Sequence, residues 1–231
     1  MGWLYDLSRM LFPVTCEVCG DALVEGEKVV CMSCDMRMPR CDFHLRPSDE
    51  LSMRFAAAKI SKVAALFPYI RKNEFARLIQ KAKYNNRPDI GRLLGEKFSR
   101  ELLPGGFFSG IDMLMPVPMH FWKQARRGYN QAYEIARGVS NVTSIPIADN
   151  LVATRSHVTQ TRKSAGDRLA SDAAGKLKVC YPDELEGRHI LLIDDVITTG
   201  ATMFACADVL RQAVPSVSLS ALALAATRFR S

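Results

Sequence analysis

The sequence predicts an α/β domain with a mainly parallel sheet, preceded by a small cysteine-rich module. From about residue 59 onward, strand-like segments alternate with helix-like segments, the order that parallel strands and their crossover helices require. The segment 189–193 is apolar after its first residue, as strands are when a parallel sheet buries both of their faces. Two Cys-x-x-Cys pairs near the N-terminus indicate the module. A chain of 231 residues has room for one large domain and one small module.

The composition is that of a globular protein with a basic surplus. Apolar residues make up 48% and charged residues 24% of the chain, which excludes a disordered or fibrous protein. The net charge of +7 suggests an anionic partner, and composition leaves open whether this is a phosphate ligand, nucleic acid or a membrane. Seven cysteines are an odd number, which argues against a secreted scaffold with every cysteine paired.

The first twelve residues are partly apolar but differ from a secretory leader. They lack a basic start, contain Asp6 and stop at Pro13 without a small-residue cleavage site. The spacing of Leu4, Leu7 and Leu11 predicts a short helix with one packed face; a membrane-surface helix is the alternative, but Lys and Arg are not enriched on its polar face. No run of 18 apolar residues occurs, so we expect no membrane span and a cytoplasmic protein.

The cysteine module has the spacing of a metal site. Its candidate ligands are two Cys-x-x-Cys pairs separated by eleven residues: Cys16, Cys19, Cys31 and Cys34. Four thiolates close a tetrahedral shell, so this pattern favours a structural zinc site in a zinc-ribbon module. Two disulfides or a coincidence are the alternatives, and Cys41 and His44 could replace a ligand. Cys180 and Cys206 lie in separate segments and are expected to be packing residues.

The first half of the α/β region contains two expected strands and two expected helices. An apolar run at 63–67 predicts a strand. The segments 74–83 and 89–103 carry apolar residues at helical spacing, and each predicts a helix. The segment 111–115 predicts a second strand, which a Pro-Val-Pro sequence closes.

The second half predicts two further strands, a short one and two helices. Residues 129–139 are expected to be helical, and 145–151 to contain a short strand. The apolar run 189–193 is the expected central strand. A helix is expected at 202–214, and the small-residue segment 217–226 predicts the last strand.

The stretch Ile190–Thr202 is the most informative for function. Its apolar strand ends in two adjacent acids, Asp194 and Asp195, where open α/β sheets bind their ligands. The turn that follows, and opens a helix, consists of Thr198, Thr199, Gly200, Ala201 and Thr202. Amides at a helix start, threonine hydroxyls and a glycine suit a phosphate monoester. The acids suit vicinal sugar hydroxyls or hydrated Mg²⁺ on a diphosphate, so the stretch predicts a site for phosphoribosyl pyrophosphate with Mg²⁺.

This stretch closely resembles the signature of type I phosphoribosyltransferases. Within that family the chain most resembles the ComF/GntX-type competence proteins, through four motifs in the same order: the four cysteines, Pro116-Val117-Pro118, Arg127-Gly128-Tyr129-Asn130-Gln131 and Ile190–Thr202. The resemblance implies a zinc module at 1–47 and a phosphoribosyltransferase-like domain at 48–231. It also implies that a hood, roughly Ser52 to Asn86, supplies the acceptor pocket.

A basic segment lies between the two halves of the domain. Residues 120–178 contain ten Lys or Arg and four acidic residues, so most of the surplus charge is there. The resemblance places a diphosphate-binding loop at its start, with Lys123, Arg126, Arg127 and Gly128; the alternative is a solvated basic helix start. It also places a lid at about 153–178, in which Lys163 would contact the ligand. Serine stands near the lid position where the family commonly has asparagine.

Two functions remain open at this stage. A phosphoribosyltransferase-like protein would transfer or sense the phosphoribosyl group, with Asp194 and Asp195 as catalytic residues and a role in DNA uptake. The alternative is a non-catalytic competence factor on the same fold, which would bind single-stranded DNA or a partner protein. Lys81, Lys83 and Tyr84 beside Arg87 could then contact the DNA, or simply end an amphipathic helix. The acceptor is not readable from the sequence.

Overall fold

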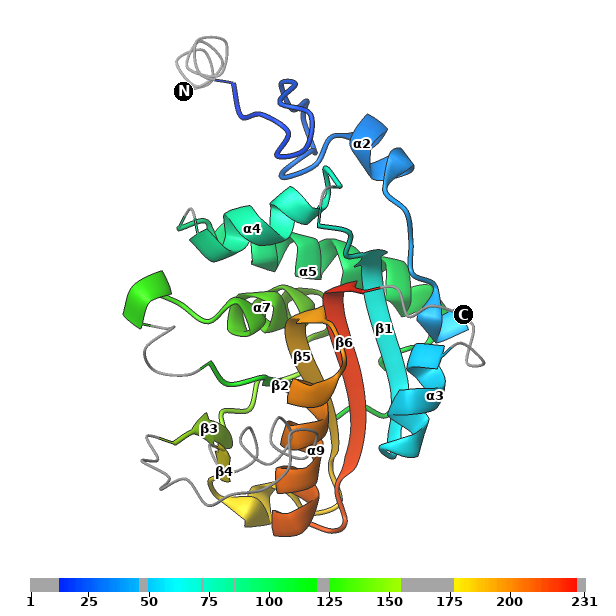
Figure 1. Cartoon of the computed structure of the whole chain (residues 1–231), viewed down its shortest axis with the longest axis vertical. Coiled ribbons are helices and arrows are strands. Elements are labelled where there is room, and N and C mark those ends of the chain that lie inside the picture. Colours follow the sequence, from blue (N-terminus) through cyan, green and yellow to red (C-terminus); the bar gives the residue numbers. More distant parts are fainter. Residues whose placement is uncertain are drawn as a thin grey trace.

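The fold was examined in a computed structural model of the chain (Figure 1), which describes residues 13–45, 50–71, 73–84, 86–119, 125–154 and 177–227. The expected helix within residues 1–12 lies outside the described residues. So do Lys123, Lys163 and the part of the expected lid between residues 155 and 176. In the described part of the chain, no helix is long and apolar enough to cross a membrane.

The main sheet has four strands, and all of its pairings are parallel. Its order is β1 (Ile60–Pro68), β6 (Ser218–Ala226), β5 (His189–Ile197) and β2 (Met113–Pro116). The expected α/β class with a mainly parallel sheet is therefore confirmed. A separate antiparallel pair joins β3 (Leu151–Ala153) and β4 (Leu177–Val179), the two ends of the expected lid segment.

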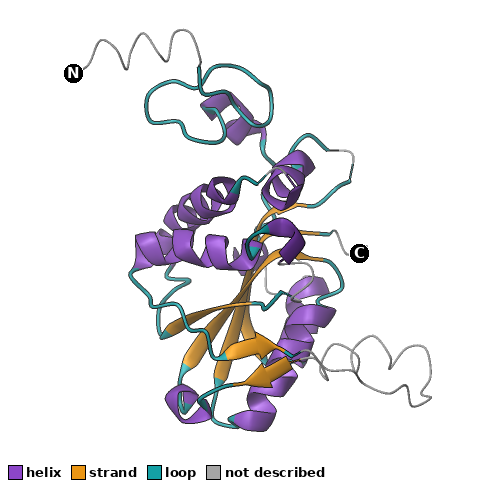
Figure 2. Ribbon diagram, turned by 90° about the vertical axis from the view of Figure 1, so that its left-hand side faces the viewer, coloured by secondary structure: helices purple, strands orange, loops and turns teal. Residues whose placement is uncertain are grey.

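Helices cover both faces of the main sheet (Figure 2). Their bounds are α2 (Met32–Arg37), α3 (Glu50–Ala57), α4 (Ala76–Tyr84), α5 (Pro88–Leu102), α7 (Gln131–Thr143) and α9 (Ala201–Ala213). Three short 3-10 turns are η1 (Phe43–Leu45), η2 (Leu103–Gly105) and η3 (Pro182–Leu185). Figure 1 shows the cysteine module at one end of the molecule, beyond α4 and α5.

Alternation along the strands divides the core into two clusters. On one face, Leu191 and Ile193 of β5 pack with α4, α5, α7 and the cysteine module. On the other face, Ile190 and Leu192 of β5 pack with α3 and α9. Because successive side chains of a strand point to opposite faces, one apolar strand supplies both clusters. This is why the segment that follows Arg188 is almost uniformly apolar.

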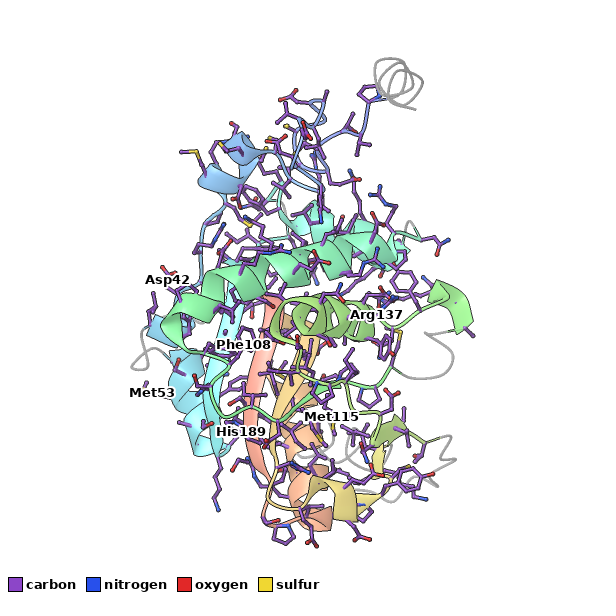
Figure 3. The ribbon with its side chains drawn as sticks, turned by 180° about the vertical axis from the view of Figure 1, so that it is seen from behind. Asp42, Met53, Phe108, Met115, Arg137 and His189 are labelled. Carbon is purple, nitrogen blue, oxygen red and sulfur yellow. The ribbon has the colours of Figure 1, made fainter. Side chains whose placement is uncertain are left out.

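Helices α5 and α7 lie side by side (Figure 3), and glycines allow their close contact. A Cβ on Gly138 would lie 2.0 Å from the carbonyl oxygen of Arg92, and one on Gly95 would lie 2.6 Å from that of Ile135. Side chains at these positions would therefore collide with backbone, which cannot move aside cheaply. This crossing fixes α7, and so the loop that precedes it, relative to α5.

Two features of the region around the lid differ from expectation. The short strand expected at 145–151 begins only at Leu151, while Ile147 forms an isolated parallel bridge with Leu114. Strand β4 lies within a stretch for which no element was expected. Both strands are only three residues long, too short for an alternation of apolar residues to stand out in the sequence.

Candidate functional site

The site lies where β5 ends and α9 begins. Because the strands of the main sheet are parallel, the carboxyl ends of β2 and β5 meet at one edge. Asp194 and Asp195 lie near the carboxyl end of β5, and the turn 198–200 leads into α9. Asp194 Oδ1 accepts a hydrogen bond of 2.7 Å from the Asp195 amide, which fixes that carboxylate against the strand.

The turn before α9 exposes its threonines and needs its glycine. Thr198, Thr199 and Thr202 are exposed, and Thr199 Oγ1 accepts from the Ala201 amide at 3.3 Å. Gly200 has φ +83°, and a Cβ there would lie 2.7 Å from the ring of Phe204. The glycine was expected to let a ligand approach; its left-handed backbone and the packed ring beneath it are further reasons for the residue.

A cavity of about 180 Å³ brings together residues from both predicted loops. Its lining includes Asp194, Asp195 and Thr202 from the β5–α9 stretch and Arg127 from the β2–α7 connection. These residues come from segments far apart in the sequence, and the edge of the sheet places them around one space. The arrangement combines two carboxylates, a hydroxyl and a guanidinium, which can bind a phosphorylated sugar.

Arg127 is held in place by two neighbours. Its Nη1 donates to Gln131 Oε1 at 2.9 Å, and its guanidinium lies 5.4 Å from the centre of the Tyr84 ring. Gly128 follows with φ +81° and lines a neighbouring cavity. Arg126 is exposed.

The loop between β2 and α7 is tied down by Asn130. Its Oδ1 caps α7 by accepting from the Ala132 amide, and its Nδ2 donates to the carbonyl oxygen of Val117 at 3.0 Å. The neighbouring cavity, of about 560 Å³, extends from this loop to β3. It shares three lining residues with the smaller cavity: Pro118, Met119 and Asn130.

Lys83 pairs with a site residue, Asp195, and this pairing was not predicted from the sequence. Its Nζ lies 2.8 Å from Asp195 Oδ2, and both side chains are largely buried. Lys83 stood out in the sequence only as a candidate DNA contact at a helix end. The available signal was its place in the hood, two residues after Lys81, but the partner lies far away in the chain and only the fold joins them.

The four predicted metal ligands converge. The Sγ atoms of Cys16, Cys19, Cys31 and Cys34 all lie within 4.8 Å of one another, and three of the residues are buried. Cys19 Sγ and Cys31 Sγ are 3.8 Å apart. Ligand bonds of about 2.3 Å in a tetrahedron give sulfur separations of about 3.8 Å, so the cluster fits a four-thiolate metal centre.

Backbone amides favour the thiolate form of Cys16. The Cys31 amide donates to Cys16 Sγ at 3.3 Å. Burial raises the pKa of Cys16, but hydrogen bonds from the amides of Cys19 and Cys31 outweigh it and lower the pKa to about 7. All seven cysteines lie within the described residues, and none of them forms a disulfide there. Cys41 and His44 are not part of the four-cysteine group.

Acidic residues next to the cysteines bind the cysteine module to α4, to α5 and to the segment between them. Glu17 Oε2 accepts from Lys81 at 2.7 Å, and Glu17 Oε1 accepts from Arg87 at 2.6 Å. Asp35 does the same with Lys97 at 2.7 Å and Arg40 at 2.9 Å. Lys81 and Arg87 are two of the candidate DNA contacts, and both are paired with Glu17 within the molecule.

Known proteins similar to the chain carry names from competence and DNA use. Competence protein F of Haemophilus influenzae is 32% identical over 139 residues, which cover 58% of this chain and 61% of that protein, less than two thirds of its length. DNA utilization protein YhgH of Escherichia coli K12 is 28% identical over 84% of this chain and 83% of its own length. Competence protein ComFC of Bacillus subtilis is 30% identical over 48% of this chain and 43% of its own length.

Two solved structures with phosphoribosyl chemistry in their names are weakly similar. A glutamine phosphoribosylpyrophosphate amidotransferase from B. subtilis is 21% identical with a TM-score of 0.40, over 62% of this chain and 30% of that one. A purine phosphoribosyltransferase from Pyrococcus horikoshii is 12% identical with a TM-score of 0.32, over 58% and 80% of the two chains. No protein-family model matches the chain. The chain is therefore a homologue of the proteins named competence protein F, ComFC and YhgH, as the order of its motifs predicted.

Proposed function

We propose that this protein binds phosphoribosyl pyrophosphate with Mg²⁺ at the carboxyl edge of its sheet, and transfers or senses the phosphoribosyl group in a process of DNA uptake or use. The observation that carries the proposal is the cavity in which Asp194, Asp195, Thr202 and Arg127 meet. An anion-binding turn, a pair of acids and a guanidinium are the groups that the parts of this ligand require. The names of the homologues support the biological setting.

Each group in the cavity has a distinct chemical task. The threonines and amides at the start of α9 would bind the 5-phosphate. Asp194 and Asp195 would hold the ribose hydroxyls and favour positive charge at the sugar carbon as the diphosphate departs. Arg127 would neutralise the departing diphosphate, and the predicted contacts Lys123, Arg126 and Lys163 would add to it. Mg²⁺, when bound, would lower the charge of the diphosphate, and Asp194 and Asp195 are the carboxylates of the cavity lining that would hold it.

The test of ligand binding compares acidic residues inside and outside the cavity. Calorimetry with Mg²⁺ and phosphoribosyl pyrophosphate should show binding to the wild-type chain and none to the Asp194→Asn, Asp195→Asn double variant. Asp183→Asn changes an exposed acid on η3 and should bind like wild type. An unchanged affinity in the double variant would contradict the proposal.

A further assay separates transfer from sensing. Release of pyrophosphate in the presence of a nucleobase or amine would identify a transferase, whereas binding without release would identify a sensor. A second candidate function is binding of single-stranded DNA, favoured by the exposed Tyr84 ring with Arg127 against it. Strongly salt-dependent DNA binding that ignores phosphoribosyl pyrophosphate would support this candidate instead.

We also propose that the cysteine cluster holds a structural zinc ion. Four thiolates leave no open position for a substrate, and the small module has little apolar core of its own. Elemental analysis of protein purified without chelator should find one zinc per chain, and Cys34→Ser should lower that content. Purified protein without zinc would contradict this assignment.

A further inference from the structure

The last turn of α4 contacts three parts of the candidate site. The carbonyl oxygen of Ala82 accepts a hydrogen bond from the hydroxyl of Tyr129, which belongs to the loop before α7. The next residue, Lys83, pairs with Asp195, and Tyr84 packs against Arg127. Three successive residues thus contact the loop, the acid and the guanidinium.

The same turn is fastened to the cysteine module. Lys81 Nζ donates to Glu17 Oε2 at 2.7 Å and to the carbonyl oxygen of Glu17 at 3.1 Å. Arg87, shortly after the helix, donates to the other carboxylate oxygen at 2.6 Å. The Glu17 side chain is only 12% exposed, so these two cations neutralise a largely buried carboxylate.

The pair Lys83–Asp195 has a consequence for ligand binding. An ammonium group already occupies one oxygen of the acid that would hold the ligand's hydroxyls or Mg²⁺. A ligand that takes Asp195 would release Lys83, whose Nζ lies 2.8 Å from this cavity-lining acid. The freed ammonium would then be available to an anionic group of the ligand, so the lysine that balances the acid in the free protein would balance the diphosphate in the complex.

We propose that Lys83 is a diphosphate-binding residue and that Glu17 positions it, by holding the last turn of α4 against the site through Lys81 and Arg87. This inference rests on the proposed function. It assigns to an acid of the cysteine module, on the far side of α4 from the cavity, a role in ligand affinity. In this role Lys83 contributes to binding of the diphosphate and not to binding of the ribose 5-phosphate part of the ligand.

The chain offers a matched control for Glu17. Glu17 and Asp35 each follow a cluster cysteine, and each accepts hydrogen bonds from two cations. Asp35 reaches Lys97 of α5 and Arg40, but not α4. A general loosening of the module should affect both variants equally, whereas a positioning role through α4 belongs to Glu17 alone.

Calorimetry tests the inference with phosphoribosyl pyrophosphate and Mg²⁺. Glu17→Gln should lower the affinity about tenfold, and Asp35→Asn less than about twofold, with the metal content unchanged in both. Lys81→Met, which alters no neighbour of a cysteine, should repeat the loss if Glu17→Gln disturbs the metal. Glu17→Asp should restore part of the affinity.

A double-mutant cycle tests whether Glu17 acts through Lys83. Lys83→Met should lower the affinity for phosphoribosyl pyrophosphate about tenfold but leave that for ribose 5-phosphate, which lacks the diphosphate, unchanged or higher. Glu17→Gln should add little in the Lys83→Met background. If the losses of affinity from Glu17→Gln and Lys83→Met add, or if Asp35→Asn lowers the affinity as much as Glu17→Gln does, this inference is overturned while the proposed function still stands. Failure of the wild-type chain to bind phosphoribosyl pyrophosphate would overturn the proposed function and this inference together.

Discussion

At the scale of single residues, Gly200 carries two constraints that no other amino acid meets. Its φ of +83° is in the left-handed region, and a Cβ would lie 2.7 Å from Phe204 and 3.2 Å from Phe55. We expect Gly200→Ala to lower the free energy of unfolding by about 3 kcal/mol, from backbone strain and overpacking together. Urea denaturation followed by circular dichroism measures this.

The control for that variant is Gly105→Ala. Gly105 has open space around its Cβ position and no left-handed backbone, so its replacement should change the free energy of unfolding by less than about 1 kcal/mol. Equal effects of the two substitutions would show that the environment of Gly200 adds no constraint.

His189 predicts a pH dependence of stability. Burial and the nearby Lys62 lower its pKa in the folded state, although the backbone of Gly110 and Asp112 act in the opposite direction. Between that lowered pKa and the unfolded value of about 6.5, the unfolded chain binds more protons, so stability must fall as pH falls through this window. Its Nε2 also lies 2.9 Å from Oγ of the buried Ser220.

The measurement is the urea midpoint at about pH 7.5 and about pH 5.5, on either side of the unfolded pKa of about 6.5. The wild type should lose stability on acidification, and His189→Asn should lose less. His44, whose pKa burial also lowers, accounts for part of the remaining slope. A variant with an unchanged slope would exclude His189 as a source.

At the scale of elements, the crossing of α5 and α7 depends on particular glycines. Gly138→Ala would place a methyl group 2.0 Å from the Arg92 carbonyl oxygen and 2.8 Å from the Glu96 amide. We expect a loss of more than about 3 kcal/mol in the free energy of unfolding, because the two backbones must separate.

Gly91→Ala is the matched substitution on the same interface. There the nearest atom, Ile135 Cγ1, would be 3.5 Å away, an ordinary contact. The higher helix propensity of alanine then makes the change neutral or stabilising by up to about 1 kcal/mol. Thermal unfolding of the two variants separates them, and a Gly138→Ala chain as stable as wild type would contradict the account.

Much of the fold was predictable from local patterns. The apolar run at 189–193 identified β5, which in the structure continues to Ile197. The expected end came early because Asp194 and Asp195 interrupt the apolar run while remaining in the strand. Helices α4, α5, α7 and α9 were expected within a few residues of their bounds, since one apolar stripe marks each of them.

The contacts that complete the site were not predictable in this way. No helix was expected from the sequence at the position of α3, yet Phe55 of α3 packs against Phe204 next to Gly200. The pairing of Lys83 with Asp195 joins a hood helix to the central strand. A single sequence shows where the charged residues lie along the chain. Which of them pair depends on the tertiary fold.

At the scale of the whole molecule, the cysteine module shares one apolar core with α4 and α5. Cys16, Val29 and Cys34 belong to the same buried cluster as Phe98 of α5. We expect chelation of the metal to speed amide exchange in α4 and α5 while β5 and β6 stay protected. Exchange measured by mass spectrometry before and after chelation tests this, and unaltered rates in both helices would contradict it.

The order of strands in the sheet has a consequence for the newborn chain. Strand β6 lies between β1 and β5, although the ribosome makes it after both of them. Until residues 218–226 emerge, β1 and β5 have no partner between them, and their edges stay open. A polypeptide without β6 therefore offers strand edges to other chains. Synthesis of β6 closes the sheet between β1 and β5 and covers these edges.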